Sequence, residues 1–254
     1  MPTEGLVAEE ITVHYGGVLA NDHVSISVQP GQTVGLIGPN GAGKTSFIDA
    51  LSGFTGASGK ISLSGIRLDG LPPHRRRRLG LGRTWQAGEL FESLTILENV
   101  LVAERGVGFR TVLRDLGVGR KLDRRPAMAV LERLGLSEFA DQRPGELPLG
   151  MQRVVGVARA MAGKSKVLLL DEPAAGLDSE ESREFGNRLK DLARTGCGTL
   201  LVDHDIDLVF QACSQIYVLD FGRIIASGPA EKVRTDPLVL EAYLGADAST
   251  AVEK

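Results

Sequence analysis

Three short runs of hydrophobic residues stand out along this chain, at residues 33–37, 167–170 and 199–202. Runs of this length, rich in Val, Leu and Ile, are typical of strands that are buried on both faces. Between them lie helical patterns, of which residues 180–194 are the clearest because apolar side chains recur at helical spacing before Gly196. A helix is also expected from just after Gly43 to Ser52. Strands alternating with helices predict an α/β fold with a parallel sheet and helices on both faces.

A second pattern, strict alternation of apolar and polar residues, appears at residues 11–15 and 24–28. It predicts half-buried strands of the antiparallel kind. Short strands are expected around the turn at residues 64–65, and a hairpin is expected between residues 216 and 225. The chain therefore combines two kinds of sheet.

The middle of the chain, from about residue 88 to 162, has helical character. It is interpreted as an insert between parts of the parallel sheet. Three helices are expected there, at residues 95–104, 126–134 and 150–162. The predicted organisation is one domain over residues 1–254, with a core built from residues 1–87 and 163–254, a helical subdomain at about 88–162 and a C-terminal tail at 236–254.

Composition narrows the functional classes. The chain has 254 residues, 43% of them hydrophobic, and a net charge of −3, so a bulk nucleic-acid partner is not indicated. Its two cysteines, Cys197 and Cys213, are interpreted as buried or free thiols in a reducing compartment. No apolar run approaches the roughly 20 residues of a membrane span, and the first residues predict no signal peptide. We expect a cytoplasmic protein that docks on a membrane partner.

The strongest local motif follows the first buried run and fits G-x-x-x-x-G-K-[ST] at every fixed position. It consists of Gly38, Pro39, Asn40, Gly41, Ala42, Gly43, Lys44 and Thr45. Glycines let backbone N–H groups turn inward around phosphate oxygens, and the helix N-terminus adds positive potential. We expect Lys44 to reach the β- and γ-phosphates of ATP, Thr45 to bind Mg²⁺, and Ser46 to contact the α-phosphate. A glycine-rich turn with a chance lysine is the alternative, which the strand–loop–helix context disfavours.

Two carboxylates, Asp171 and Glu172, end the second buried run. Ligand sites in parallel sheets lie at this edge. Asp171 is predicted to hold Mg²⁺, directly or through water, and Glu172 to polarise the attacking water as general base. The alternative is an acidic pair that caps the next helix.

Five further segments, taken in order and spacing, resemble the nucleotide-binding subunit of an ABC transporter. They are residues 84–86, 147–153, 157–161, 174–178 and 203–205. The resemblance covers about residues 6–245. It implies a P-loop ABC ATPase core with a mostly parallel sheet, an antiparallel β subdomain and an inserted helical subdomain.

The resemblance also implies roles for single residues. Tyr15 matches the aromatic that stacks on adenine, and Gln86 matches the glutamine that contacts Mg²⁺ or the water and couples the site to the membrane partner. His204 matches the histidine at the γ-phosphate, and Asp178 matches the loop aspartate at the dimer interface. The alternatives are a core tyrosine, an ordinary loop glutamine and a structural histidine.

Residues 147–153, here named the partner-site segment, match the stretch that closes the ATP site of a second subunit. Leu147, Gly150 and Gln152 belong to it. Pro148 departs from the family's serine and offers neither a hydroxyl nor an N–H to a γ-phosphate. Backbone N–H groups from Gly150 onward still suit an anion at a helix N-terminus. We therefore expect this segment to support the ATP site of the second subunit less well than the usual sequence would, but not to lose that role.

Partners follow from the same resemblance. Two subunits sandwich two ATP molecules head to tail, so a homo- or heterodimer is expected. Integral membrane permeases are expected as direct partners on the inner face of the cell membrane, with a substrate-binding protein as an indirect one. A soluble ABC ATPase acting on ribosomes or DNA, and a module that binds ATP without hydrolysing it, are the competing classes.

Two stretches, residues 81–100 and 236–245, resemble the branched-chain amino acid importer ATPases. Related ATPases for urea, short amides or lipopolysaccharide export share parts of both. One charge run remains, at residues 74–78. It is interpreted as a solvated helix face near the membrane, with a nucleic-acid or anionic-lipid patch as the alternative.

Overall fold

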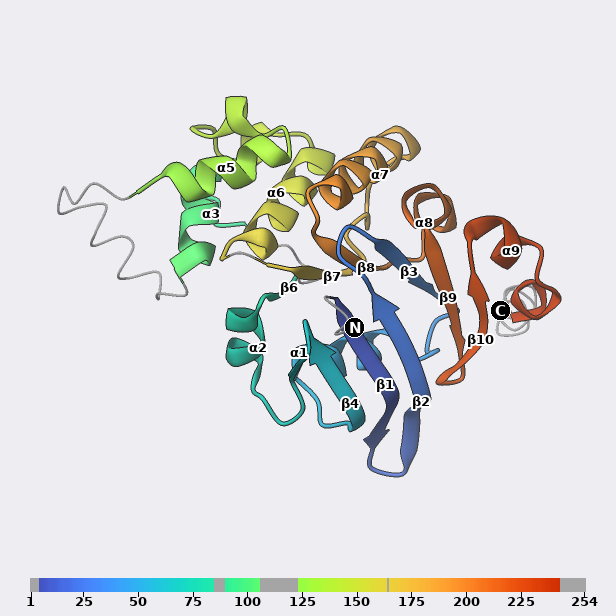
Figure 1. The fold of residues 1–254 in the computed structure, drawn as a ribbon. Helices are drawn as coiled ribbons and strands as arrows, with labels where there is room; N and C mark the ends of the chain where they lie inside the picture. The colour runs from blue at the N-terminus through green and yellow to red at the C-terminus, as the bar shows by residue number, and fades with distance from the viewer. Residues whose placement is uncertain (1–4, 85–89, 106–122, 164, 243–254) are drawn as a thin grey trace.

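The computed structural model describes residues 5–84, 90–105, 123–163 and 165–242 (Figure 1). The strands are β1 Leu6–Tyr15, β2 Val18–Val28, β3 Thr33–Ile37, β4 Ser58–Leu63, β5 Ile66–Arg67, β6 Leu81–Arg83, β7 Val167–Asp171, β8 Gly198–Val202, β9 Gln215–Asp220 and β10 Arg223–Gly228. The helices are α1 Lys44–Ser52, α2 Pro73–Leu79, α3 Ile96–Arg105, α5 Arg125–Arg133, α6 Leu149–Met161, α7 Ser179–Arg194, α8 Ile206–Ala212 and α9 Ala230–Arg234. Two 3₁₀ turns, Ser137–Phe139 and Pro144–Glu146, lie between α5 and α6.

The larger sheet has six strands in the order β10-β9-β3-β8-β7-β6. All neighbours pair in parallel except β9 and β10, which form the expected hairpin. The three hydrophobic runs form β3, β7 and β8, and every residue of these strands is buried. Strand β6 was not predicted, because three residues are too few to show a period. It is recognisable only by its pairing with β7.

The smaller sheet is antiparallel, in the order β2-β1-β4-β5, as the alternating patterns predict. In Figure 1 it lies on one side of the six-stranded sheet, and α6, α7 and α8 lie on the other. The prediction of helices on both faces is confirmed, since α6, α7 and α8 pack on one face and α1 packs on the other. One face is covered by α1 together with the antiparallel sheet, because strands with one apolar side must bury that side against another layer.

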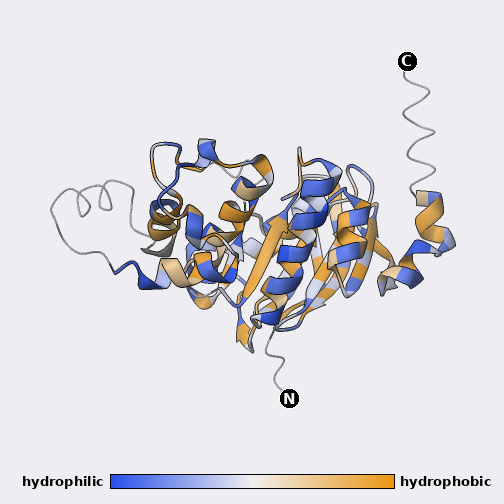
Figure 2. Cartoon of the chain, turned by 90° about the horizontal axis from the view of Figure 1, so that it is seen from above, coloured by the Kyte–Doolittle hydropathy of each residue, from blue (hydrophilic) through white to orange (hydrophobic). Residues whose placement is uncertain are grey.

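Alternate side chains of the central strands belong to two separate hydrophobic clusters, one on each face of the sheet. Leu168 and Leu170 of β7 belong to the cluster that includes α6, α7 and α8. Leu169 belongs to the cluster that includes α1 and the antiparallel sheet. Figure 2 shows the consequence, a hydrophobic central strand flanked by helices with mixed hydrophilic and hydrophobic residues. Within the described ranges, no helix is long and apolar enough to cross a membrane.

The arginine run falls on α2, but the expected solvated helix face is wrong for two of its members. Arg75 and Arg78 are exposed, whereas Arg76 is only 5% exposed. Its Nη1 donates to the carbonyl oxygens of Ala50 and Leu51, each at 2.7 Å. These oxygens belong to the last turn of α1, where the helix leaves carbonyls unpaired, so a guanidinium is a suitable cap.

The next arginine points elsewhere. Arg77 Nη2 donates to the carbonyl oxygen of Ala103 in α3 at 3.0 Å. It also lies 3.4 Å from the carbonyl oxygen of Ala162, just beyond α6. Adjacent arginines thus join α2 to the phosphate-loop helix on one side and to α3 and α6 on the other.

Candidate active site

The candidate phosphate loop connects β3 to α1 at the carboxyl edge of the six-stranded sheet. Gly43 is the N-cap of α1 and has a φ of 103°. A Cβ at this position would lie 2.3 Å from the carbonyl oxygen of Ala20. Position 43 therefore requires glycine both for its backbone conformation and for space. The motif stands at the strand–loop–helix junction that the sequence predicts.

Lys44 begins α1 and turns its side chain back over the loop. Its Nζ donates to the carbonyl oxygens of Gly38, at 2.7 Å, and Pro39, at 2.9 Å. Burial lowers the pKa of the ammonium, and the nearby charges of Glu172 and Asp171 act in the opposite direction. Lys44 follows β3, and Asp171 and Glu172 stand at the end of β7, so the three charged groups lie at the same edge of the sheet.

Asp171 ends β7, only 2% exposed. Its Oδ2 accepts a hydrogen bond from Arg83 Nη2 at 3.1 Å, while Oδ1 is buried without a partner among the described residues. Burial raises the pKa of this carboxyl, and the charge of Arg83 opposes that effect. Arg83 also donates from Nη1 to Asp49 Oδ1 at 2.6 Å. Sequence reasoning missed Arg83, because its role depends on strand pairing between β6 and β7.

The chemistry of these groups fits Mg²⁺. A buried carboxylate oxygen without a protein partner suits a hard cation or its bound water. Thr45 is exposed in the first turn of α1. In the described part of the chain, no three His, Cys, Asp or Glu residues cluster around a common point. Gln86, the other predicted metal residue, lies outside the described residues.

Glu172 follows β7 with a φ of 46°, in the left-handed region that side chains with a Cβ rarely adopt. Such a backbone costs on the order of 1–3 kcal/mol and is frequent at functional sites. Its N–H donates to the carbonyl oxygen of Val202 at 2.7 Å, so β8 holds the strained residue in place. The side chain is half-buried. The alternative interpretation, that Asp171 and Glu172 cap the next helix, is excluded because Asp178 is the N-cap of α7.

His204 lies just beyond β8, and its side chain is 64% exposed. Its Nδ1 is 3.5 Å from Oδ1 of the buried Asp203. Asp203 was not assigned a role from sequence, yet it accepts hydrogen bonds from Ala174 N at 3.1 Å and Asp205 N at 3.0 Å. Burial raises its pKa, and these backbone bonds oppose the rise. The signal was available, since Asp203 directly follows a buried strand and Asp171 ends one.

Tyr15 is the last residue of β1 and is 47% exposed. It pairs with Val18 at the tip of the β1–β2 hairpin. Further along β2, the fully buried Asn21 donates from Nδ2 to the carbonyl oxygen of Gly43 at 3.1 Å. This bond attaches the hairpin that carries Tyr15 to the phosphate loop. Sequence reasoning missed Asn21, because an isolated asparagine in a strand carries no recognisable motif.

The partner-site segment lies at the start of α6, and no hydrogen bond in the described ranges joins it to the phosphate loop. Leu147 is buried, and its carbonyl oxygen accepts from Gln152 Nε2 at 3.0 Å. Pro148 is the N-cap of α6 and provides no side-chain cap. Asp178 Oδ1 accepts from the N–H groups of Glu180 and Glu181, each at 2.9 Å. The four residues predicted for a partner's site thus form a separate group.

Family models agree with this architecture. The model described as "ABC transporter" matches residues 21–175, which is more than half of the chain. A second, described as "Branched-chain amino acid ATP-binding cassette transporter", matches residues 223–249.

Full-length relatives also match. The chain is 38% identical to the "High-affinity branched-chain amino acid transport ATP-binding protein LivG" of Salmonella typhimurium, over 94% of this chain and 97% of that protein. It is 37% identical to BraF of Pseudomonas aeruginosa, named for the same transport, over 92% and 95% of the two chains. The "Lipopolysaccharide export system ATP-binding protein LptB" of Haemophilus influenzae is more distant, at 33% identity over 94% and 97%.

Among solved structures, the ADP conformation of MJ1267, an ATP-binding cassette of an ABC transporter, superposes with a TM-score of 0.83. It is 32% identical, and the match covers 95% of this chain and 99% of that one. ATPases of this kind bind nucleotide and work as dimers with membrane permease subunits. The chain belongs to the ABC transporter family, as an ATP-binding and ATP-hydrolysing subunit homologous to the ATP-binding proteins of branched-chain amino acid transporters.

Proposed function

We propose that this subunit powers the uptake of branched-chain amino acids. The observation that carries the proposal is the match of residues 223–249 to the branched-chain amino acid family model, in addition to the general ABC match at 21–175. The named relatives support it, with LivG at 38% identity and LptB at 33%. Import of urea or short amides and export of lipopolysaccharide are the alternatives, since the ATPase does not itself select the cargo.

In the proposed mechanism, the backbone N–H groups of residues 38–46, apart from Pro39, which has none, bind the phosphates of ATP at the start of α1. Lys44 moves its ammonium from the carbonyl oxygens of Gly38 and Pro39 to the β- and γ-phosphates. Thr45, Asp171 and Gln86 hold Mg²⁺, which supplies charge neutralisation on the phosphates when it is bound. Arg83 favours the ionised form of the Asp171 carboxyl, because its charge and hydrogen bond oppose the rise in pKa that burial causes.

Glu172 acts as general base on the attacking water, and His204 contacts the γ-phosphate. Two features of the backbone support this placement. The positive φ of Glu172 is a strained conformation that β8 maintains through Val202. The buried Asp203 lies beside His204 and accepts from the loop that follows Glu172, so it holds both residues at one edge. Tyr15 is proposed to stack on adenine.

The site is completed by a second subunit, identical or different. Its partner-site segment would close over the phosphates, while Leu147, Gly150, Gln152 and Asp178 of this chain serve the second ATP. We further propose that residues of about 88–162 form the helical subdomain that carries this segment.

The permease is proposed to dock beside the end of α1, on the inner face of the membrane. Phe54 is 53% exposed there, and the Arg83 guanidinium lies 5.7 Å from its ring centroid. Arg83 also contacts Asp171, the proposed Mg²⁺ ligand. A permease that moves Phe54 would therefore be linked to Asp171 through the Arg83 side chain. Phe54→Asp should abolish copurification with permeases while leaving ATP binding unchanged.

Glu172→Gln tests hydrolysis. We expect ATP binding to persist, steady-state hydrolysis to fall by at least a hundredfold, and ATP-bound dimers to accumulate in gel filtration, since removing a general base typically costs 10²–10⁴ in rate. Glu184→Gln, an exposed position on α7, is the matched control and should retain full turnover. Unchanged turnover of Glu172→Gln would remove Glu172 as the base.

Cargo is tested by transport. A deletion strain should lose uptake of radiolabelled leucine, and the wild-type gene, but not Glu172→Gln, should restore it. Unchanged leucine uptake together with lost uptake of urea, or with a defect in lipopolysaccharide, would assign the subunit to an alternative transporter.

A further inference from the structure

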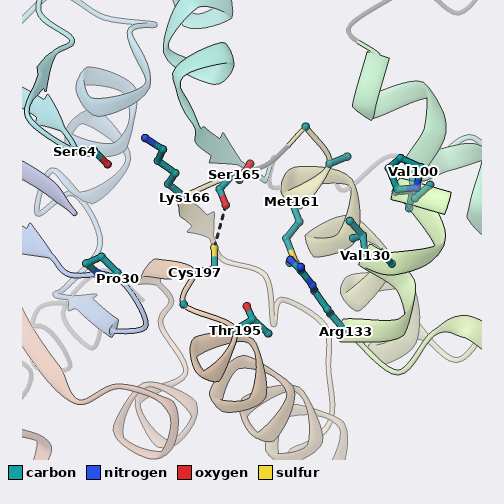
Figure 3. A pocket seen from close by; sticks show the side chains of 16 residues that line it. Pro30, Ser64, Val100, Val130, Arg133, Met161, Ser165, Lys166, Thr195 and Cys197 are labelled. Carbon is teal, nitrogen blue, oxygen red and sulfur yellow. Dashed lines mark hydrogen bonds between the residues drawn. The ribbon is translucent and has the colours of Figure 1, made fainter. Parts of the chain in front are cut away.

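A cavity of about 830 Å³ lies away from the proposed ATP site (Figure 3). Lys166 and Cys197 line it, and these residues come directly before β7 and β8. Asp171 ends β7 and Asp203 follows β8. Since both strands run parallel, the cavity and the proposed ATP site occupy opposite edges of the same sheet.

The lining combines an apolar wall with positive charge. Pro126 and Val130 of α5 and Met161 of α6 contribute apolar side chains. Arg133 and Lys166 are the charged residues, and no Asp or Glu is among the described residues that line the cavity. A local charge of two positive groups without a carboxylate contrasts with the net charge of −3 for the whole chain.

Arg133 is the cation best placed to receive a ligand. In the described part of the chain its side chain has no ion pair or hydrogen bond, whereas the nearby Arg188 donates to the carbonyl oxygen of Leu134 at 2.7 Å. Figure 3 shows Arg133 and Met161 among the side chains that line the cavity. The charge of Arg133 also reaches Cys197, where it opposes the burial that raises the pKa of the thiol to about 11.

We propose that this cavity binds a small amphiphilic anion, with an aliphatic tail on the wall of Pro126, Val130 and Met161 and a carboxylate or phosphate head on Arg133. The volume lies within the roughly 300–1,000 Å³ of small-molecule sites. A tail of about ten carbons suits that space. An amino acid zwitterion is disfavoured, because the described lining residues include no carboxylate to receive its ammonium group.

The position of the cavity gives the ligand a route to the ATPase, a consequence that rests on the proposed function. Met161 ends α6, and Gly150 of the partner-site segment lies at the other end of the same helix. The 13 residues of α6 span about 20 Å as one rigid element. A ligand that bridges α5 and α6 to the loops before β7 and β8 would restrain the partner-site segment relative to the sheet.

Binding is tested by isothermal titration calorimetry of the full chain with decanoate, decyl phosphate and decanol. We expect one decanoate or decyl phosphate per chain, and at least tenfold weaker binding of the neutral decanol. Arg133→Glu should weaken anion binding at least tenfold, and Lys190→Glu, an exposed lysine with the same change of charge on α7, should leave it unchanged. Equal affinity for decanol, or unchanged binding to Arg133→Glu, would overturn the proposal.

Val130→Phe provides a second variant that keeps both cations and changes the shape of the apolar wall on which the tail is proposed to lie. It should weaken binding of both anions at least tenfold, and unchanged binding would place them elsewhere on the surface. The titrations are repeated on Glu172→Gln, so that the binding result does not depend on hydrolysis or on the proposed cargo. Which of the two anions binds more tightly distinguishes a carboxylate ligand from a phosphate ligand.

Discussion

The backbone N–H of Gly150 donates a hydrogen bond to Glu181 Oε1 at 3.1 Å. The other oxygen of the same carboxylate accepts from Asp178 N at 3.2 Å. Glu181 thus links the partner-site segment at the start of α6 to the start of α7. The Gly150 N–H is one of the donors that we propose for the γ-phosphate in the partner's site, and it already donates to the Glu181 carboxylate. A nucleotide at this position must therefore compete with Glu181 for that N–H.

Glu181→Ala should lower the free energy of unfolding by about 1–2 kcal/mol, because the reciprocal cap of α7 and the bond to Gly150 are both lost. Glu181→Gln keeps an acceptor oxygen and should cost less. Urea denaturation measures both. Glu184→Ala, exposed on the same helix, is the control, and an equal loss in that variant would show that the two contacts contribute nothing.

Pro148→Ser should raise ATP hydrolysis in any dimer where this segment faces a nucleotide. Pro148 is the N-cap of α6 with φ −54° and ψ 152°, a conformation that serine adopts freely, and serine adds a hydroxyl for the helix or the phosphate. Steady-state ATPase activity of the complex with its permeases is the measurement. Pro148→Ala distinguishes the effect of the added hydroxyl from the effect of losing the proline ring. No gain in activity with serine would mean that other residues already compensate for the proline at this position.

Arg76→Met should cost about 3 kcal/mol of unfolding free energy. The buried guanidinium donates to the carbonyl oxygens of Ala50, Leu51 and Leu71, and charged hydrogen bonds each contribute roughly 1.5–3 kcal/mol. Arg78→Met, at an exposed position of the same helix, should cost less than about 0.5 kcal/mol. Similar losses in the two variants, measured by chemical denaturation, would refute the cap.

Both thiols should react slowly in the native protein. Burial raises the pKa of Cys197 from 9.0 to about 11, which reduces its thiolate fraction at neutral pH about a hundredfold, and it raises the pKa of Cys213 further. Labelling with a disulfide reagent should accelerate as pH rises, because the thiolate is the nucleophile, and should become fast in denaturant. The single variants Cys197→Ser and Cys213→Ser assign the rates, and rapid labelling of either thiol at pH 7 would contradict its burial.

Much of the site was predictable because its signals are local. The phosphate loop joins a hydrophobic run to a helix start within a few residues, and Asp171 and Glu172 end another run directly. The predicted ends of α1, α3, α5, α6 and α7 agree with the structure to within about one residue, since apolar periodicity, glycine and proline act over short stretches.

The missed residues depend on contacts between distant parts of the chain. Arg83 reaches its hydrogen-bond partners only when β6 pairs with β7. Asn21 can donate to the carbonyl oxygen of Gly43 only when β2 packs beside the phosphate loop. The arginine run shows the same limit. The four consecutive arginines cannot be told apart from the sequence alone. In the structure, the turn of α2 directs Arg76 toward α1 and Arg77 toward α3 and α6. Arg75 and Arg78 are exposed.

By itself, the sequence determined the α/β class, the phosphate loop, the acidic strand end and the resemblance to ABC ATPases, since backbone propensity and motif spacing are written into neighbouring residues. Only the tertiary structure decided which face the antiparallel sheet covers, which arginines are buried, where Asp203 and Glu181 attach loops to one another, and that a cationic apolar cavity exists. These features arise because strand pairing and helix packing bring together groups whose separation along the chain carries no periodic signal.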